Sequence, residues 1–323
     1  MTKKKPALLY CGILDGRGGA SDSAIPSDWT GEKGILWVHL DAHDEPSREW
    51  LKKQSGLDPT IVDALLAEET RPRSIATESG LLVVLRGVNT NPGSDPEDMV
   101  SIRLWIEHNR IISTRLRKLL SVVDLRDCLQ KGIGPKSSGQ FLCFLIARLA
   151  DRIGDFIDDI ESRVGQAEES IGDMEQTEFR HAITTLRQQI ASVRRYLAPQ
   201  RDALDRLYKQ PGGWLSDADS RDLRDEADRI TRYLEDLDLA RERTMVLREE
   251  FLGQLAQEQN SRMYVLSVVA AVFLPLTFIT GLLGMNVGGL PGIESPRGFL
   301  ASLVVMVVAG VGLLAFFRAK KWL

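Results

Sequence analysis

The chain has 323 residues, of which 43% are apolar and 27% are charged, with a formal net charge of −4. This balance is typical of a folded chain and excludes a disordered one. The small net charge and the lack of a long Lys/Arg block argue against a nucleic-acid partner. Three cysteines, Cys11, Cys128 and Cys143, have no C-x-x-C spacing and are odd in number. We therefore expect no disulfide framework, and a reducing cytoplasm around most of the chain.

Residues 1–135 mix strand and helix patterns and predict a cytoplasmic α/β domain with a mixed sheet. The predicted elements are a strand at 34–40, helices at 46–54 and 58–67, a buried strand at 81–85, and a hairpin of 102–107 with 110–115 that turns at His108-Asn109. The turn-forming segment 89–98 predicts an exposed linker.

Residues 136–262 predict long cytoplasmic helices, because apolar residues recur there at three- and four-residue steps. The first such run extends from Leu142 to Val164, and the second from Phe179 to Leu197, where we expect Pro199 to interrupt the helix. The third run fits a coiled-coil seam formed by Leu223, Ala227, Ile230, Leu234, Leu237, Thr244, Leu247, Phe251 and Leu255. This seam predicts one helix over about 217–283, roughly 100 Å long.

Two apolar runs near the C-terminus, residues 263–283 and 299–317, contain no Asp, Glu, Lys, Arg or His. About 20 apolar residues cross a hydrocarbon core of about 30 Å as a helix, so both runs predict transmembrane helices. Positive charge flanks them at Arg262 and in the tail 318–323, whereas the loop 284–298 carries only Arg297 and Glu294. This distribution places both termini in the cytoplasm and the loop outside. Because two helices cannot enclose a pore, the working unit must be a homo-oligomer in a lipid bilayer.

The first apolar run closes with FLPLTFITGLL and is followed directly by Gly284-Met285-Asn286. This resembles the CorA family of two-span divalent-cation transporters, whose hallmark is Gly-Met-Asn at the outer end of the first span. The segments VGGLPG at 287–292, RPRS at 71–74 and LRGVN at 85–89 are similar to the ZntB branch of that family. The aromatic residue and acidic Met-Pro-Glu-Leu loop that usually follow the motif in the magnesium branch are missing. The resemblance implies a funnel-shaped homopentamer in a bacterial inner membrane, with zinc preferred and Gly284, Met285 and Asn286 as the selectivity filter.

Seven residues before the motif share one helix face, since they advance by three or four positions at a time. They are Asn260, Met263, Leu266, Ala270, Leu274, Thr277 and Gly281. Around a symmetry axis this face would line a pore, with polar rings at its ends and an apolar throat between them. The alternative is that the stripe packs against a neighbouring helix, which small residues suit equally well.

A path of neutral oxygens suits an ion that keeps its water shell, because Mg²⁺ and similar cations dehydrate reluctantly. A site for bare zinc would need His or Cys, and neither span has one. We expect capture of a hydrated ion at Asn286 and closure of the throat at Met263 and Leu266 by dewetting. Pro275 predicts a kink, with a hinge or an additional pore oxygen as the functional alternatives. The resemblance to the ZntB branch raises the question of coupling to protons. Such coupling would have to use Glu294 or cytoplasmic acids, because neither span contains Asp, Glu or His.

His39 and His43 could hold a metal at the end of a strand, although a histidine inside an apolar strand is more often a core residue. No nucleophile elbow, phosphate loop or catalytic triad is present, so we expect neither enzymatic activity nor a prosthetic group. Three alternatives to zinc transport remain open at this point. They are a magnesium or cobalt channel of the same family, a membrane-anchored scaffold or signalling protein, and a membrane-tethered hydrolase built around the two histidines.

Overall fold

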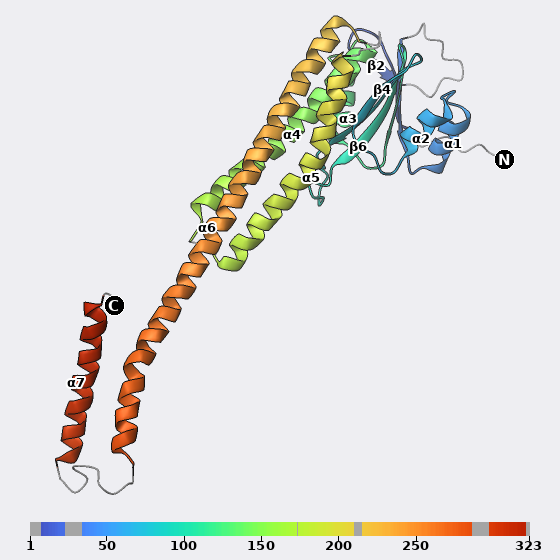
Figure 1. Ribbon diagram of the computed structural model, residues 1–323. Coiled ribbons are helices and arrows are strands. Elements are labelled where there is room, and N and C mark those ends of the chain that lie inside the picture. Colours follow the sequence, from blue (N-terminus) through green and yellow to red (C-terminus); the bar gives the residue numbers. More distant parts are fainter. Residues whose placement is uncertain (1–7, 23–33, 173, 210–214, 286–296, 321–323) are drawn as a thin grey trace. The chain divides into compact units, whose positions relative to one another are not determined.

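The computed structural model describes residues 8–22, 34–172, 174–209, 215–285 and 297–320 (Figure 1). The chain divides into two compact units, Met1–Arg248 and Glu249–Leu323. The helix α6 (Asp217–Leu283) contributes to both units, and each unit is described below by itself.

The first unit is built on a seven-stranded sheet with the order β2-β1-β3-β7-β6-β5-β4. Its strands are β1 (Leu8–Leu14), β2 (Ala20–Asp22), β3 (Ile35–Asp41), β4 (Arg73–Ala76), β5 (Leu81–Gly87), β6 (Val100–Ile106) and β7 (Arg110–Arg115). The pair β3–β7 is parallel and the other neighbouring pairs are antiparallel. The sheet is therefore mixed, as predicted.

Helices cover the two faces of this sheet (Figure 1). The short helices α1 (Glu45–Lys53) and α2 (Pro59–Leu66) lie on one side, and α2 packs on β6 and β7. The helices α4 (Ser138–Glu169) and α5 (Gln176–Lys209) pack against β5, and α5 also against β4. Because both faces are covered, β5 and β6 are buried almost throughout, which explains the uninterrupted apolar run at 81–85.

Local sequence signals set the start of both short helices. Asp44 accepts a hydrogen bond from the Ser47 amide at 2.8 Å, and Asp58 accepts one from the Thr60 amide at 2.8 Å. Each aspartate thereby caps a helix that has proline in its first turn, where no amide donor is needed. The two predicted helices are confirmed.

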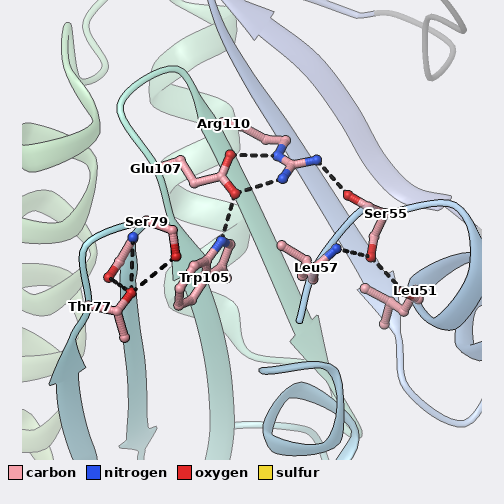
Figure 2. Close-up of polar contacts among 9 residues, drawn as sticks. Leu51, Ser55, Leu57, Thr77, Ser79, Trp105, Glu107 and Arg110 are labelled. Carbon is pink, nitrogen blue, oxygen red and sulfur yellow. Dashed lines mark hydrogen bonds and ion pairs between the residues drawn. The ribbon is translucent and has the colours of Figure 1, made fainter. Parts of the chain in front are cut away.

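A hydrogen-bonded network ties the β6–β7 hairpin to the loop between α1 and α2 (Figure 2). Arg110 makes two hydrogen bonds to the Glu107 carboxylate, at 2.8 and 2.6 Å, and a third to the Ser55 carbonyl at 2.7 Å. Trp105 Nε1 donates to the same carboxylate at 2.8 Å. The Glu107 amide donates to the Arg110 carbonyl at 2.8 Å and closes the turn at His108-Asn109, so the predicted hairpin is confirmed.

The long helices also agree with the sequence pattern. The apolar positions predicted for α4 and α5 are buried, and the seam of α6 is buried from Leu223 to Leu247. Phe251 and Leu255, which continue the predicted seam, are only half-buried. A further helix, α3 (Leu120–Gln130), packs on α4.

One expectation was wrong. Pro199 lies inside α5, which continues to Lys209. Buried residues on both sides of the proline, Leu197 and Leu204 among them, provide packing that outweighs the one lost backbone hydrogen bond. The segment 89–98 is largely exposed, as predicted, except at its start, where Asn89 is buried and its side chain accepts a hydrogen bond from Asn91 Nδ2.

The second unit contains the last part of α6 and the helix α7 (Gly298–Ala319). Both helices are long and apolar enough to cross a membrane, and no residue of either most apolar 18-residue window is buried. Large apolar side chains such as Phe278 and Phe299 are exposed instead. Such exposure is stable only in an apolar surrounding, so these helices match the two predicted transmembrane runs.

Candidate functional site

The seven residues of the predicted pore face are all exposed on α6. The three largest of them, Met263, Leu266 and Leu274, are 62%, 64% and 70% exposed. We refer to Asn260, Met263, Leu266, Ala270, Leu274, Thr277 and Gly281 as the open face of α6.

The opposite side of α6 is partly covered. The half-buried residues there are Val268, Ala271, Val272, Pro275, Leu276 and Ile279. At 100° per residue they centre about 155° from the open face. On α7 the partly or fully covered residues also form a single face, composed of Gly298, Ser302, Met306, Ala309, Gly310, Leu313 and Phe317.

The two covered sides meet at Gly310 of α7, which has no side chain. A Cβ atom placed on Gly310 would lie 3.8 Å from Leu276 Cδ1. Small residues such as Ala309 and Gly310 let two membrane helices approach closely. The helix α7 therefore packs on the side of α6 that faces away from the open face, and leaves the open face uncovered within the second unit.

Three hydroxyl groups in the second unit's part of α6 donate to carbonyls of the same helix. Thr277 Oγ1 donates to the Phe273 carbonyl at 2.8 Å, and Thr280 Oγ1 donates to the Thr277 carbonyl at 2.9 Å. Ser267 Oγ donates to the Met263 carbonyl at 2.8 Å. Because the proton of Thr277 is engaged in this way, its oxygen offers only acceptor capacity to the open face.

Pro275 lies within α6, and the helix continues past it to Leu283. It leaves the Ala271 carbonyl without a helical donor. Both residues belong to the half-buried side, and an additional pore oxygen from this carbonyl stays a prediction. A hinge at Pro275 stays a prediction.

The structure reaches only the beginning of the predicted selectivity filter. The Gly284 amide donates to the Thr280 carbonyl at 2.9 Å, and Met285 is 47% exposed. Asn286 and the outer-loop Glu294 lie outside the described residues. Their roles stay predictions.

The two candidate metal-binding histidines lie in different surroundings. His39 is buried, and its Nδ1 lies 2.8 Å from Ser113 Oγ. Burial, together with the charge of Arg115, lowers the pKa of His39 to about 3. The His43 side chain is 63% exposed, with Nδ1 3.6 Å from Asp41 Oδ1. Across the part of the chain that the structure describes, no group of three or more His, Cys, Asp or Glu side chains could hold a metal ion.

The covered side of α6 is the part of the site that the sequence pattern did not identify. Its residues are all apolar, and most residues of the open face are apolar too, so hydropathy does not mark which side meets α7. The small residues Ala309 and Gly310 in the second apolar run were the available signal, since such residues mark close helix contacts.

Comparison with known proteins identifies the family. The family model described as CorA-like Mg²⁺ transporter protein matches residues 32–321. The chain belongs to the CorA family. The resemblance found in the Gly284-Met285-Asn286 segment is thereby confirmed over nearly the whole chain.

Relatives within the CorA family match the chain from end to end. The divalent cation transporter CmaX of Pseudomonas aeruginosa is 39% identical over 325 residues, which covers 98% of this chain and 97% of that protein. The zinc transport protein ZntB of Yersinia enterocolitica is 36% identical over 315 residues, covering 98% and 96%. The solved structure of full-length CmaX is 37% identical, covers 100% of both chains and superposes with a TM-score of 0.85. The mixed sheet, the long helices and the two C-terminal apolar helices are therefore the CorA family fold.

Proposed function

We propose that this chain is a subunit of a homopentameric transporter that moves divalent metal cations across a bacterial inner membrane. Zinc is the preferred ion, other divalent cations also permeate, and both termini lie in the cytoplasm. The names of the relatives support this assignment. The Pseudomonas protein is named a divalent cation transporter, the Yersinia protein is named a zinc transport protein, and the family description names Mg²⁺.

The arrangement of α6 and α7 is the observation that carries the proposal. A membrane anchor would bury its polar positions against the second helix or have none. Here α7 covers the opposite side of α6, and the face with Asn260 and Thr277 stays uncovered. Polar residues within spans usually face the interior of a bundle or water, so further copies of the same face would complete this surface around a pore.

The chemistry of the open face fits an ion that keeps its water shell. The ion is captured at a ring of Asn286 carboxamides and passes a ring of Thr277 hydroxyls, whose oxygens accept hydrogen bonds from the shell. Leu274, Leu266 and Met263 then form an apolar throat that closes by dewetting. Asn260 forms the polar ring at the inner end.

Neutral oxygens bind divalent cations with little discrimination, so broad permeability accompanies the zinc preference. The open face contains no titratable side chain. Passive conduction is therefore the simplest mechanism, and coupling to protons would require Glu294 or acidic groups of the first unit.

Metal uptake into proteoliposomes tests this function. We expect wild-type protein to carry Zn²⁺, and Asn286→Ala to lower the flux about tenfold or more, because a hydrogen bond to a charged group is worth about 1.5–3 kcal/mol. Ser302→Ala on the covered side of α7 is the matched control and should leave uptake unchanged. Normal uptake by Asn286→Ala would show that the ion is captured elsewhere.

The same assay separates the alternatives. A magnesium or cobalt channel, which the family description favours, would carry Mg²⁺ or Co²⁺ faster than Zn²⁺. A scaffold would show no metal flux above empty vesicles. Repeating the Zn²⁺ measurement with and without an imposed pH gradient determines whether protons contribute.

A further inference from the structure

An arginine stripe runs along the exposed side of α5. Arginine occurs at every seventh position, at Arg180, Arg187, Arg194 and Arg201, and the first three are exposed. A small residue follows four positions after each of the first three, at Thr184, Ala191 and Ala198. Residues at these spacings share one helix face, so long basic and short side chains alternate along it.

This face of α5 borders a groove of about 730 Å³. Its lining includes Arg187, Arg194 and Arg195 of α5, Arg241 of α6, and the small residues Ala191 and Ala198. All of these residues belong to the first unit. We call this surface the basic groove. Its short side chains allow another backbone to come close, and its arginines favour an acidic partner.

Most of the basic groove is not neutralised by its own chain. Arg194 Nε pairs with Asp238 Oδ1 at 2.7 Å. Arg187, Arg195 and Arg241 form no ion pair with any residue that the structure describes. An unpaired arginine cluster on a chain of net negative charge indicates an anionic partner.

A complementary face exists on α4 of the same chain. Its exposed residues are Asp155, Asp158, Asp159, Ser162, Gln166 and Glu169. Asp159 approaches Arg163 at 3.5 Å, whereas Asp155, Asp158 and Glu169 have no ion pair within the described parts of the chain. Asp155, Ser162 and Glu169 follow the same seven-residue spacing as the arginines, about 10.5 Å along a helix.

We propose that the basic groove of one subunit binds the acidic face of α4 from a second copy of this chain. The proposal rests on the homo-oligomer of the proposed function and names the surfaces that hold its first units together. Two different surfaces on one chain form a head-to-tail contact, and repetition of that contact closes a ring when the rotation fits. The shared seven-residue spacing lets arginines of α5 meet Asp155 and Glu169, with Ser162 between them, and this match fixes the register between neighbours.

Cysteine cross-linking between copies tests the contact without removing a charge. Gln188→Cys lies in the groove lining and Ser162→Cys lies on the acidic face, each in a full-length Cys128→Ser background because the other two cysteines are buried. We expect a disulfide-linked dimer when the two single variants are assembled together in detergent micelles. Arg232→Cys paired with Ser162→Cys is the control, because Arg232 lies half a turn from Arg241 on α6.

Charge reversal provides the second measurement. We expect Arg187→Glu to lower the fraction of assembled protein on dilution about threefold or more, and added Asp158→Arg to restore it. Arg232→Glu carries the same charge change and should not alter assembly. Native mass spectrometry of the full-length protein reports all four states.

The proposal is overturned if the groove pair cross-links no better than the control pair and Arg187→Glu assembles like wild type. It is also overturned if Arg187→Glu leaves assembly intact but weakens binding to phosphatidylglycerol vesicles, since the groove would then serve a lipid. Wild-type Zn²⁺ uptake is measured separately. Uptake without the cross-link would refute this interface alone, and the cross-link without uptake would refute transport alone.

Discussion

The two units of the chain differ in the exposure of their apolar side chains. In the first unit Phe141 is 1% exposed and its ring lies 4.9 Å from that of Trp37, whereas in the second unit Phe278 is 71% exposed. Water around the first unit drives its apolar side chains inward. The second unit is stable with its apolar side chains outward only if hydrocarbon surrounds it.

Polar groups differ between the units in the same way. In the first unit a buried hydroxyl bridges separate strands, since Ser113 Oγ contacts Trp37 Nε1 and His39 Nδ1, each at 2.8 Å. In the second unit the hydroxyls of Thr277 and Ser302 donate to carbonyls of their own helices. A helix in lipid must satisfy its polar groups internally. Thr277 therefore offers an oxygen acceptor to the open face of α6 without leaving an unpaired hydroxyl donor.

The largest expected contrast comes from one substitution made in both units. Phe141→Ala should lower the free energy of unfolding of the first unit by about 3–5 kcal/mol, because it leaves a cavity beside Trp37. Phe278→Ala should change the free energy of unfolding by less than about 0.5 kcal/mol, because it removes an exposed side chain. Denaturant unfolding in micelles, followed by the fluorescence of buried Trp37 and Trp105, measures both. Equal effects would contradict the assignment of separate environments.

A smaller effect should follow from His39 and pH. Its pKa in the folded chain is about 3, below the ordinary value of 6.5, so only the unfolded chain takes up this proton as pH falls from 7 to 5. The first unit should then lose about 2 kcal/mol of stability from this residue. The contribution of His39 to stability is fully present above pH 6.5 and is lost progressively as pH falls toward 3.

The variant His39→Gln isolates that contribution, because the carboxylates titrate alike in both proteins. We expect the variant to be less stable at pH 7 but to lose less stability between pH 7 and pH 5. The same unfolding experiment at the two pH values measures the difference. Identical pH dependence in the two proteins would mean that His39 takes up its proton at the same pH in the folded and the unfolded chain.

Much of the fold was predictable because its elements carry strong local signals. Asp58 and Pro59 start α2, and the apolar seam beginning at Leu223 marks α6. The strand β4 was missed because it is four residues long and mostly exposed, so it lacks an apolar pattern. Pro199 was misread because its effect on α5 depends on packing by distant elements, which a local rule does not include.

The candidate site was predictable in its composition but not in its orientation. The spacing from Asn260 to Gly281 placed those residues on one face. Spacing alone could not decide whether that face meets α7 or remains open. The contact between Gly310 and Leu276 distinguishes the two sides, and it depends on the packing of two helices.

Substitutions of Thr277 and Val272 test which side of α6 faces the transported ion. Thr277→Val keeps the shape of the side chain but removes the oxygen acceptor, so we expect Zn²⁺ flux in proteoliposomes to fall about fivefold to tenfold. Val272→Thr adds a hydroxyl on the covered side and is the converse control, with flux within about twofold of wild type. A pore on the α7 side of α6 would reverse this order.

The smallest effects concern ion pairs of similar chemistry in the two units. Arg110 and Glu107 are 22% and 25% exposed and share two hydrogen bonds, so Arg110→Gln should cost the first unit about 1 kcal/mol. Arg262 pairs with Glu258 at 3.4 Å but is 80% exposed, and Arg262→Gln should cost about 0.3 kcal/mol. Salt should weaken the second pair more than the first, because exposed charges are screened. If unfolding at low and at high ionic strength showed equal costs for both variants, burial would not be what separates them.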